Sequence, residues 1–154
     1  MKKVHLELII LLGFIIIYSC ELIDDTPGTG DLRDRIEGQW TCDENSQIYK
    51  STESDTSHIY KSTESIYVVY IDPDLYDTTK VIISNFYNLG FDIYVYARIN
   101  SLNLSIIQQT TKDGFKILSG SGSISSNYRT INWNYRVDDG SGEIDNVTAT
   151  YTKD

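Results

Sequence analysis

Hydrophobic and polar residues alternate along several short segments of this chain, and the clearest segment is FDIYVYARI at 91–99. One side of it carries only hydrophobic residues, namely Phe91, Ile93, Val95, Ala97 and Ile99. Successive side chains of a β-strand point to opposite faces, so this pattern predicts a strand with one buried face. The other face would expose Tyr94 and Tyr96.

The same alternation recurs in RTINWNYRV at 129–137 and in NVTATYT at 146–152. Less regular strands are predicted from Gly38 onward and over 66–71, 80–86, 102–109 and 115–125. Turn sequences such as NLG, KDG and DDGSG separate these segments and favour tight hairpins. The glycines of SGSGS at 119–123 are expected to bend a strand. The sequence therefore predicts an all-β antiparallel meander of about eight to nine strands, forming a barrel or alternatively a β-sandwich.

A heptapeptide repeat, IYKSTES, occupies 48–54 and again 59–65. We expect a hairpin here with Asp55 and Thr56 at its turn, since polar residues favour turns between strands. That geometry would pair Ile48 with Thr63 and Lys50 with Lys61. It would also place Tyr49 and Tyr60 on the same side of the hairpin.

The first twenty residues are typical of an export signal. Lys2 and Lys3 precede an apolar run from Leu8 to Ile17. This run is too short to span a bilayer, because a spanning helix needs about 20 apolar residues. The end of this segment, IYSC, resembles the lipobox of bacterial lipoproteins. The resemblance implies that 1–19 is a lipoprotein signal peptide and that Cys20 becomes the lipidated first residue of the mature chain.

A flexible acidic tether is expected over 20–31, where Pro, Gly and acidic residues occur without periodicity. Glu21, Asp24 and Asp25 resemble the acidic patch of surface-exported lipoproteins of the Bacteroidetes. This resemblance implies a lipid-anchored protein of the bacterial outer membrane that is exposed at the cell surface, or alternatively faces the periplasm.

The net charge is −9 over 154 residues, with 13 basic and 22 acidic side chains. Without residues 1–19 the chain would have 11 basic and 21 acidic residues and a net charge of −10. Nucleic acids and anionic lipid headgroups reward basic surfaces, so this charge argues against both as partners. Membrane attachment would come from the lipid on Cys20.

The domain predicted over 32–154 carries a further resemblance at its start. Gly38 and Trp40 in GQW resemble the G-x-W signature of lipocalins and other calycins, where a short helical turn precedes the first strand. The resemblance implies a lipocalin-like barrel with a small hydrophobic or amphipathic ligand inside. It also implies that an arginine from a late strand, Arg136 or Arg129, packs on the tryptophan.

Candidate catalytic chemistry is sparse. His58 is the one histidine of the predicted mature chain, and a lone histidine makes neither a zinc site nor a nucleophilic triad. Cys42 is expected to be a small buried hydrophobe. The acidic stretches IDPDLYD and DDGSGEID could supply oxygens to calcium, but Asp, Pro and Gly also simply form turns.

These observations predict a binding module with no catalytic residues, cofactor or metal. Its ligand would be a small hydrophobic molecule inside the barrel. Alternatively, exposed tyrosines would bind a glycan or a protein, because their rings combine an apolar body with a polar tip. The candidate surface tyrosines are Tyr49, Tyr60, Tyr94 and Tyr96.

Overall fold

The computed structural model of the chain describes residues 30–51 and 57–153, without the side chains of residues 50–60. The predicted signal peptide, Cys20 and the tether up to residue 29 lie outside the described residues. Within the described ranges, no helix has the length and hydrophobicity needed to cross a membrane.

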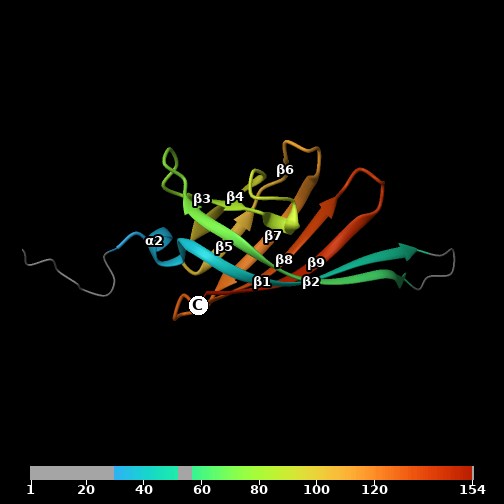
Figure 1. The fold of residues 1–154 in the computed structure, drawn as a ribbon, viewed down its shortest axis with the longest axis horizontal. Helices are drawn as coiled ribbons and strands as arrows, with labels where there is room; N and C mark the ends of the chain where they lie inside the picture. The colour runs from blue at the N-terminus through green and yellow to red at the C-terminus, as the bar shows by residue number, and fades with distance from the viewer. Residues whose placement is uncertain (1–29, 52–56, 154) are drawn as a thin grey trace, which may run out of the picture.

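The fold is a closed antiparallel β-barrel (Figure 1). A short helix, α2 (Leu32–Ile36), precedes the barrel, and one 3-10 turn, η1 (Phe86–Asn88), joins β3 to β4. The strands are β1 (Gly38–Ser51), β2 (Ser57–Pro73), β3 (Lys80–Ser84), β4 (Tyr94–Asn100), β5 (Asn103–Ile106), β6 (Gln109–Thr110), β7 (Lys116–Ile124), β8 (Thr130–Asp138) and β9 (Ile144–Thr152).

Closure comes from two pairings between distant parts of the chain. β1 pairs with β9, and β5 pairs with β7, so eight strands form a ring while β6 adds a short ninth strand beside β7. This confirms the all-β antiparallel meander and the barrel, rather than the sandwich. The barrel is consistent with the lipocalin-like architecture that the GQW motif suggested.

Strands were predicted correctly where hydrophobic and polar residues alternate without interruption. In β8, Ile131, Trp133, Tyr135 and Val137 are buried, as the sequence predicted. In β9 the same holds for Val147, Ala149 and Tyr151. The Thr and Asn residues between them point outward, so one period-two pattern supplies both the core and the outer surface.

The predicted strand at 91–99 starts too early, and the one at 80–86 ends too late. β3 stops at Ser84, because Asn85, Tyr87 and Asn88 adopt positive φ angles of 60°, 57° and 55°. These left-handed residues turn the chain into η1, which buries Phe86 inside the barrel. Phe91 therefore lies before β4, and its side chain is 54% exposed instead of buried.

The predicted register of the repeat is wrong. Ile48 pairs with Lys61, and Lys50 pairs with His58. A constant register runs from the Gly38–Ile71 pair to Ile48, where the long buried strands determine it, and a bulge in β2 then skips one residue. The predicted turn at Asp55 and Thr56 lies outside the described residues. The relative sides of Tyr49 and Tyr60 also fall outside them, because the side chain of Tyr60 is not described.

The end of the barrel near α2 is closed around Trp40. This side chain is fully buried, and its indole nitrogen donates to the carbonyl oxygen of Ile36 at 2.8 Å. The cation over its ring is Lys153, whose Nζ lies 5.6 Å from the ring centroid. Of the two expected arginines, Arg136 points outward from β8, because it shares the outward parity of Asn134. Packing of Arg129 on the tryptophan stays a prediction.

The barrel interior is packed by large side chains, and two glycines of β7 make room for them. A Cβ atom added to Gly122 would lie 2.8 Å from Cε3 of Trp133, and one added to Gly120 would lie 2.8 Å from Cδ1 of Ile106. The glycines of SGSGS thus allow close packing inside the barrel, a role that the prediction of a strand bend did not include.

We expect Gly122→Ala to lower the free energy of unfolding by about 1–3 kcal/mol, because the added methyl group overpacks the interior against the fully buried Trp133. Chemical denaturation would measure the loss. Ser123→Ala, one residue along on the outer face, is the matched control and should change stability by less than about 0.5 kcal/mol. Equal stability of the Gly122→Ala variant and the wild type would contradict the packing argument.

Candidate functional site

The barrel interior, where the sequence predicted a ligand, contains a buried carboxyl group. Glu44 is 4% exposed and accepts hydrogen bonds from the hydroxyl groups of Tyr67 and Tyr135. Burial raises the pKa of Glu44, and the two hydroxyl donors partly oppose that rise. The nearby hydroxyl of Tyr151 is buried and has no hydrogen-bond partner among the described residues.

Cys42, the neighbour of this network, behaves as the sequence predicted. It is a free and buried cysteine, and burial raises the pKa of its thiol to about 12. A thiol with so high a pKa holds almost no thiolate at neutral pH, and the thiolate is the reactive form. The interior therefore combines tight packing with a polar network rather than a reactive nucleophile.

The acidic stretches named in the sequence form turns. The carboxylate of Asp74 accepts from the backbone nitrogens of Tyr76 and Asp77. The carboxylates of Asp138 and Asp139 accept from the backbone nitrogens of Gly140 and Ser141. Such local bonds are the ordinary turn role of aspartate, so these three residues act as turn formers.

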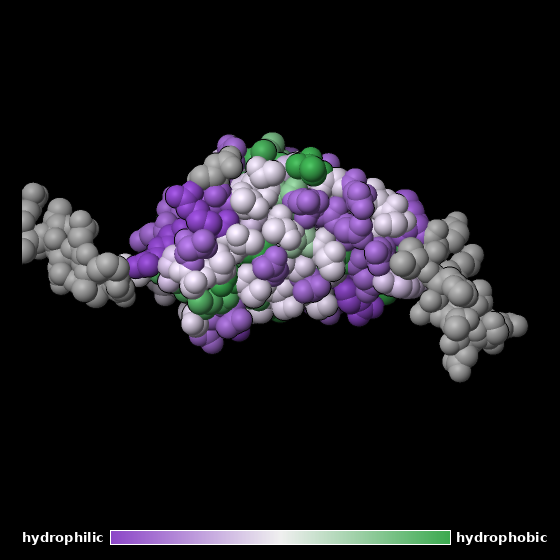
Figure 2. Space-filling model, turned by 90° about the horizontal axis from the view of Figure 1, so that it is seen from below, coloured by the Kyte–Doolittle hydropathy of each residue, from purple (hydrophilic) through white to green (hydrophobic). Residues whose placement is uncertain are grey.

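Much of the outer surface is hydrophilic or close to neutral. Figure 2 shows this on the face seen from below in Figure 1, where strongly hydrophobic atoms form only small, separate patches. Exposed aromatic side chains stand out against such a surface.

Four of them form what we call the aromatic patch: Tyr70, Phe91, Tyr94 and Tyr96. Their side chains are between 39% and 54% exposed. Tyr94 and Tyr96 share the outer face of β4, as the sequence predicted. Tyr70 reaches the same face from β2, because Ser84 of β3 pairs with both Tyr70 and Tyr94.

The rings of the aromatic patch are spaced along and across the strands. Tyr70 and Tyr94 flank β3, which separates their Cα atoms by about 10 Å, and Tyr94 and Tyr96 are about 7 Å apart along β4. The small Ser84 lies between the first two. Phe91 packs edge-on against Tyr70, with 5.7 Å between the ring centroids. The hydroxyl of Tyr70 donates to Oε1 of Gln39 at 2.8 Å.

Sequence reasoning missed two members of this patch. Phe91 was predicted to face inward, and Tyr70 was part of a short predicted strand with no assigned role. The alternation around Val69 and Ile71, both fully buried, is the signal that could have placed Tyr70 outward. Phe91 had no such signal, since its exposure depends on the left-handed residues before it.

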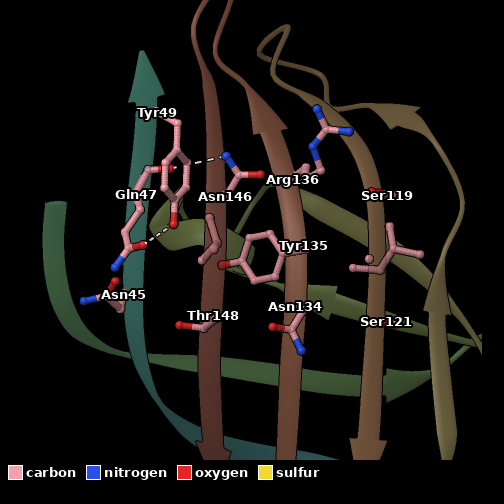
Figure 3. Close-up of a pocket in the computed structure, with 13 residues that line it drawn as sticks. Asn45, Gln47, Tyr49, Ser119, Ser121, Asn134, Tyr135, Arg136, Asn146 and Thr148 are labelled. Atoms are coloured by element: carbon pink, nitrogen blue, oxygen red, sulfur yellow. Dashed lines mark hydrogen bonds between the residues drawn. The ribbon is translucent and has the colours of Figure 1, made fainter. Parts of the chain in front are cut away.

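Tyr49 belongs to a different surface, a hollow on the outer face of β1, β9, β8 and β7 that we call the polar groove (Figure 3). Its volume is about 530 Å³, within the range of small-molecule sites. The side chains that line its outer face are Asn45, Gln47, Tyr49, Asn134, Arg136, Asn146, Thr148, Ser119 and Ser121. The structure thus separates Tyr49 from Tyr94 and Tyr96, and the side chain of Tyr60 lies outside the described residues.

We expect Glu44→Gln to stabilise the protein more at pH 8 than at pH 4.5. Because the folded-state pKa of Glu44 is raised above its usual value of 4.5, the unfolded chain loses this proton first as the pH rises. The wild type therefore loses stability between that value and the folded-state pKa, whereas glutamine has no proton to lose. Thermal unfolding of both proteins at the two pH values would measure the difference.

The exposed Glu64 provides the control, as Glu64→Gln. A stability difference between Glu44→Gln and the wild type that stays constant across this pH range would contradict the burial of an ionisable Glu44.

No known protein family matches this chain, and no curated protein matches it in sequence. A functional assignment therefore depends on the barrel and its two outer surfaces.

Proposed function

We propose that this protein is a lipid-anchored module of a bacterial cell surface that binds carbohydrate on the aromatic patch, without catalysis. The exposure of Tyr70, Phe91, Tyr94 and Tyr96 on one face of the barrel carries this proposal. The anchor is the lipid on Cys20, in the manner of the Bacteroidetes lipoproteins that the N-terminal segment resembles. The outer membrane is the proposed location.

The chemistry of a sugar ring favours this kind of surface. A pyranose presents C–H groups on its faces and hydroxyl groups around its rim. Aromatic rings cover the faces, while tyrosine hydroxyls and amides bind the rim. The three tyrosines supply both parts, and Gln39 beside Tyr70 keeps an amide nitrogen available because its oxygen accepts the tyrosine hydroxyl.

The spacing of the rings supports an oligosaccharide rather than a single sugar. Tyrosines whose Cα atoms are about 7 Å and about 10 Å apart can each contact a different unit of one chain. The strands that carry the three tyrosines are paired in a closed barrel, so the backbone beneath these rings is in place before a ligand arrives. Such preorganisation reduces the entropy lost on binding.

A small hydrophobic ligand inside the barrel stays a prediction. Trp40, Phe86, Trp133 and Tyr151 fill the interior and are fully buried or nearly so. A ligand would have to displace these side chains, whereas the aromatic patch is open to solvent.

Glycan binding predicts a loss of affinity in the double variant Tyr94→Ala and Tyr96→Ala. Removing one stacking ring typically reduces affinity by about fivefold, since an aromatic contact contributes about 1 kcal/mol beyond its buried area. A glycan array would identify a ligand for the wild type, and calorimetry would compare the proteins. Tyr76→Ala is the matched control, because Tyr76 is 99% exposed in the β2–β3 loop and lies outside the patch.

Unchanged glycan binding in the double variant would contradict the proposal. Binding of a protein partner that the double variant abolishes, in the absence of any glycan ligand, would instead assign the patch to protein recognition.

Lipid attachment predicts that cells supplied with labelled palmitate label the wild type but not Cys20→Ala. In the lipoproteins that the segment resembles, the sulfur of the lipobox cysteine carries a diacylglyceryl group through a thioether, and alanine has no sulfur to carry it. Protein immunoblots would confirm that both forms are expressed. Label that persists in Cys20→Ala would exclude this anchor.

A further inference from the structure

The polar groove lies on other strands of the barrel than Tyr94 and Tyr96 of the aromatic patch. In the ring of strands, β2 and β3 separate β1 of the groove from β4, while β5 separates β7 of the groove from β4. A ligand in the groove would therefore not touch Tyr94 or Tyr96. Whatever the groove binds, it binds independently of the function proposed above.

The lining of the groove is unusual for this chain. Acidic residues outnumber basic ones by 22 to 13 in the whole sequence, yet no Asp or Glu lines the groove among the residues whose side chains the structure describes. Its described polar side chains are amides and hydroxyls, with Arg136 as the one charged residue among them. Such a surface offers many neutral hydrogen-bonding groups and a single positive charge.

Arg136 has no competing carboxylate beside it on either neighbouring strand. Its cross-strand partners are Ser119 on β7 and Asn146 on β9, both neutral. Among the described residues it forms no salt bridge. The two nearest acids in the sequence already have partners: Asp138 pairs with Lys116, and Asp139 accepts a hydrogen bond from the backbone nitrogen of Ser141.

The opposite wall of the groove holds an aromatic ring in place. The hydroxyl of Tyr49 donates to Oε1 of Gln47 at 2.7 Å, and the amide of Asn146 donates to the backbone oxygen of Gln47 at 3.5 Å. Figure 3 shows Tyr49, Gln47 and Asn146 side by side, with the guanidinium of Arg136 farther along the groove. The side chain of Tyr49 is 45% exposed, so the ring is open to a ligand.

We propose that the polar groove is a second binding site, which takes an acidic sugar such as a uronic acid unit of a polysaccharide. The guanidinium of Arg136 binds the carboxylate through its planar pair of N–H donors. The amides and hydroxyls of the groove bind the sugar hydroxyls, and the ring of Tyr49 covers one face of the sugar. The positive charge selects acidic sugars over neutral ones.

Calorimetric titration of the full mature chain with oligogalacturonate and with a neutral galactose oligomer of equal length tests this site. We expect the acidic oligomer to bind at least tenfold more tightly, because hydrogen bonds to charged partners are the stronger ones. Raising the salt concentration should weaken the acidic oligomer's binding, since the ionic contact is partly exposed. Sodium acetate is the control ligand, because it has a carboxylate but no sugar ring.

The variant Arg136→Gln should lose about tenfold or more in affinity for the acidic oligomer, while Arg129→Gln, just before β8 and outside the groove, should bind like the wild type. Tyr49→Ala should weaken the same binding. The aromatic-patch variant Tyr94→Ala with Tyr96→Ala should leave it unchanged, so failure of one site is distinguishable from failure of the other.

Equal affinity for acidic and neutral oligomers, or unchanged binding in Arg136→Gln, would overturn the site. Acetate that binds as tightly as the acidic oligomer would overturn its assignment to a sugar.

Discussion

The pairing of β5 with β7 is the constraint on which the barrel depends, because without it the sheet stays open. Gly122 and Gly120 of β7 pair with Leu104 and Ile106 across this junction, and on their other side with Trp133 and Tyr135 of β8. Any side chain at either glycine would collide with these neighbours inside the barrel. Because the two glycines have no side chains, the large core residues of β8 and the closing strand β5 can both pack against β7.

The alternation of hydrophobic and polar residues predicted the strands whose buried faces it determines directly. β8 and β9 follow strict alternation, and the structure confirms their buried faces. The segment around Phe86 has the same apolar content, but three left-handed residues end the strand, and alternation says nothing about φ. The register of the repeat failed for a different reason. Its two copies are identical, so the distant Gly38–Ile71 end of the hairpin determines which residues pair.

The sequence predicted which residues of a single strand face outward, but not which outward residues of different strands come together. Alternation alone placed Tyr94 and Tyr96 outward, and it would equally have placed Tyr70. Their assembly depends on which strands are neighbours, as does the separation of Tyr49 from them. The same holds for Arg136: its outward parity can be read from β8, but the absence of acidic neighbours depends on its pairing with β7 and β9. Closure also explains why one small domain presents two chemically different sides.

The junction at Lys153 has a mechanical consequence. Its ammonium group binds the carbonyl oxygens of Arg35 and Glu37, so the last strand is tied to the helix that precedes the first one. A pull on the chain before Asp31 would reach β1 at Gly38, between β2 and β9. Load applied along a strand that is paired on both sides shears many hydrogen bonds at once instead of opening them singly. The barrel is thus suited to stay folded under a pull on its N-terminal end.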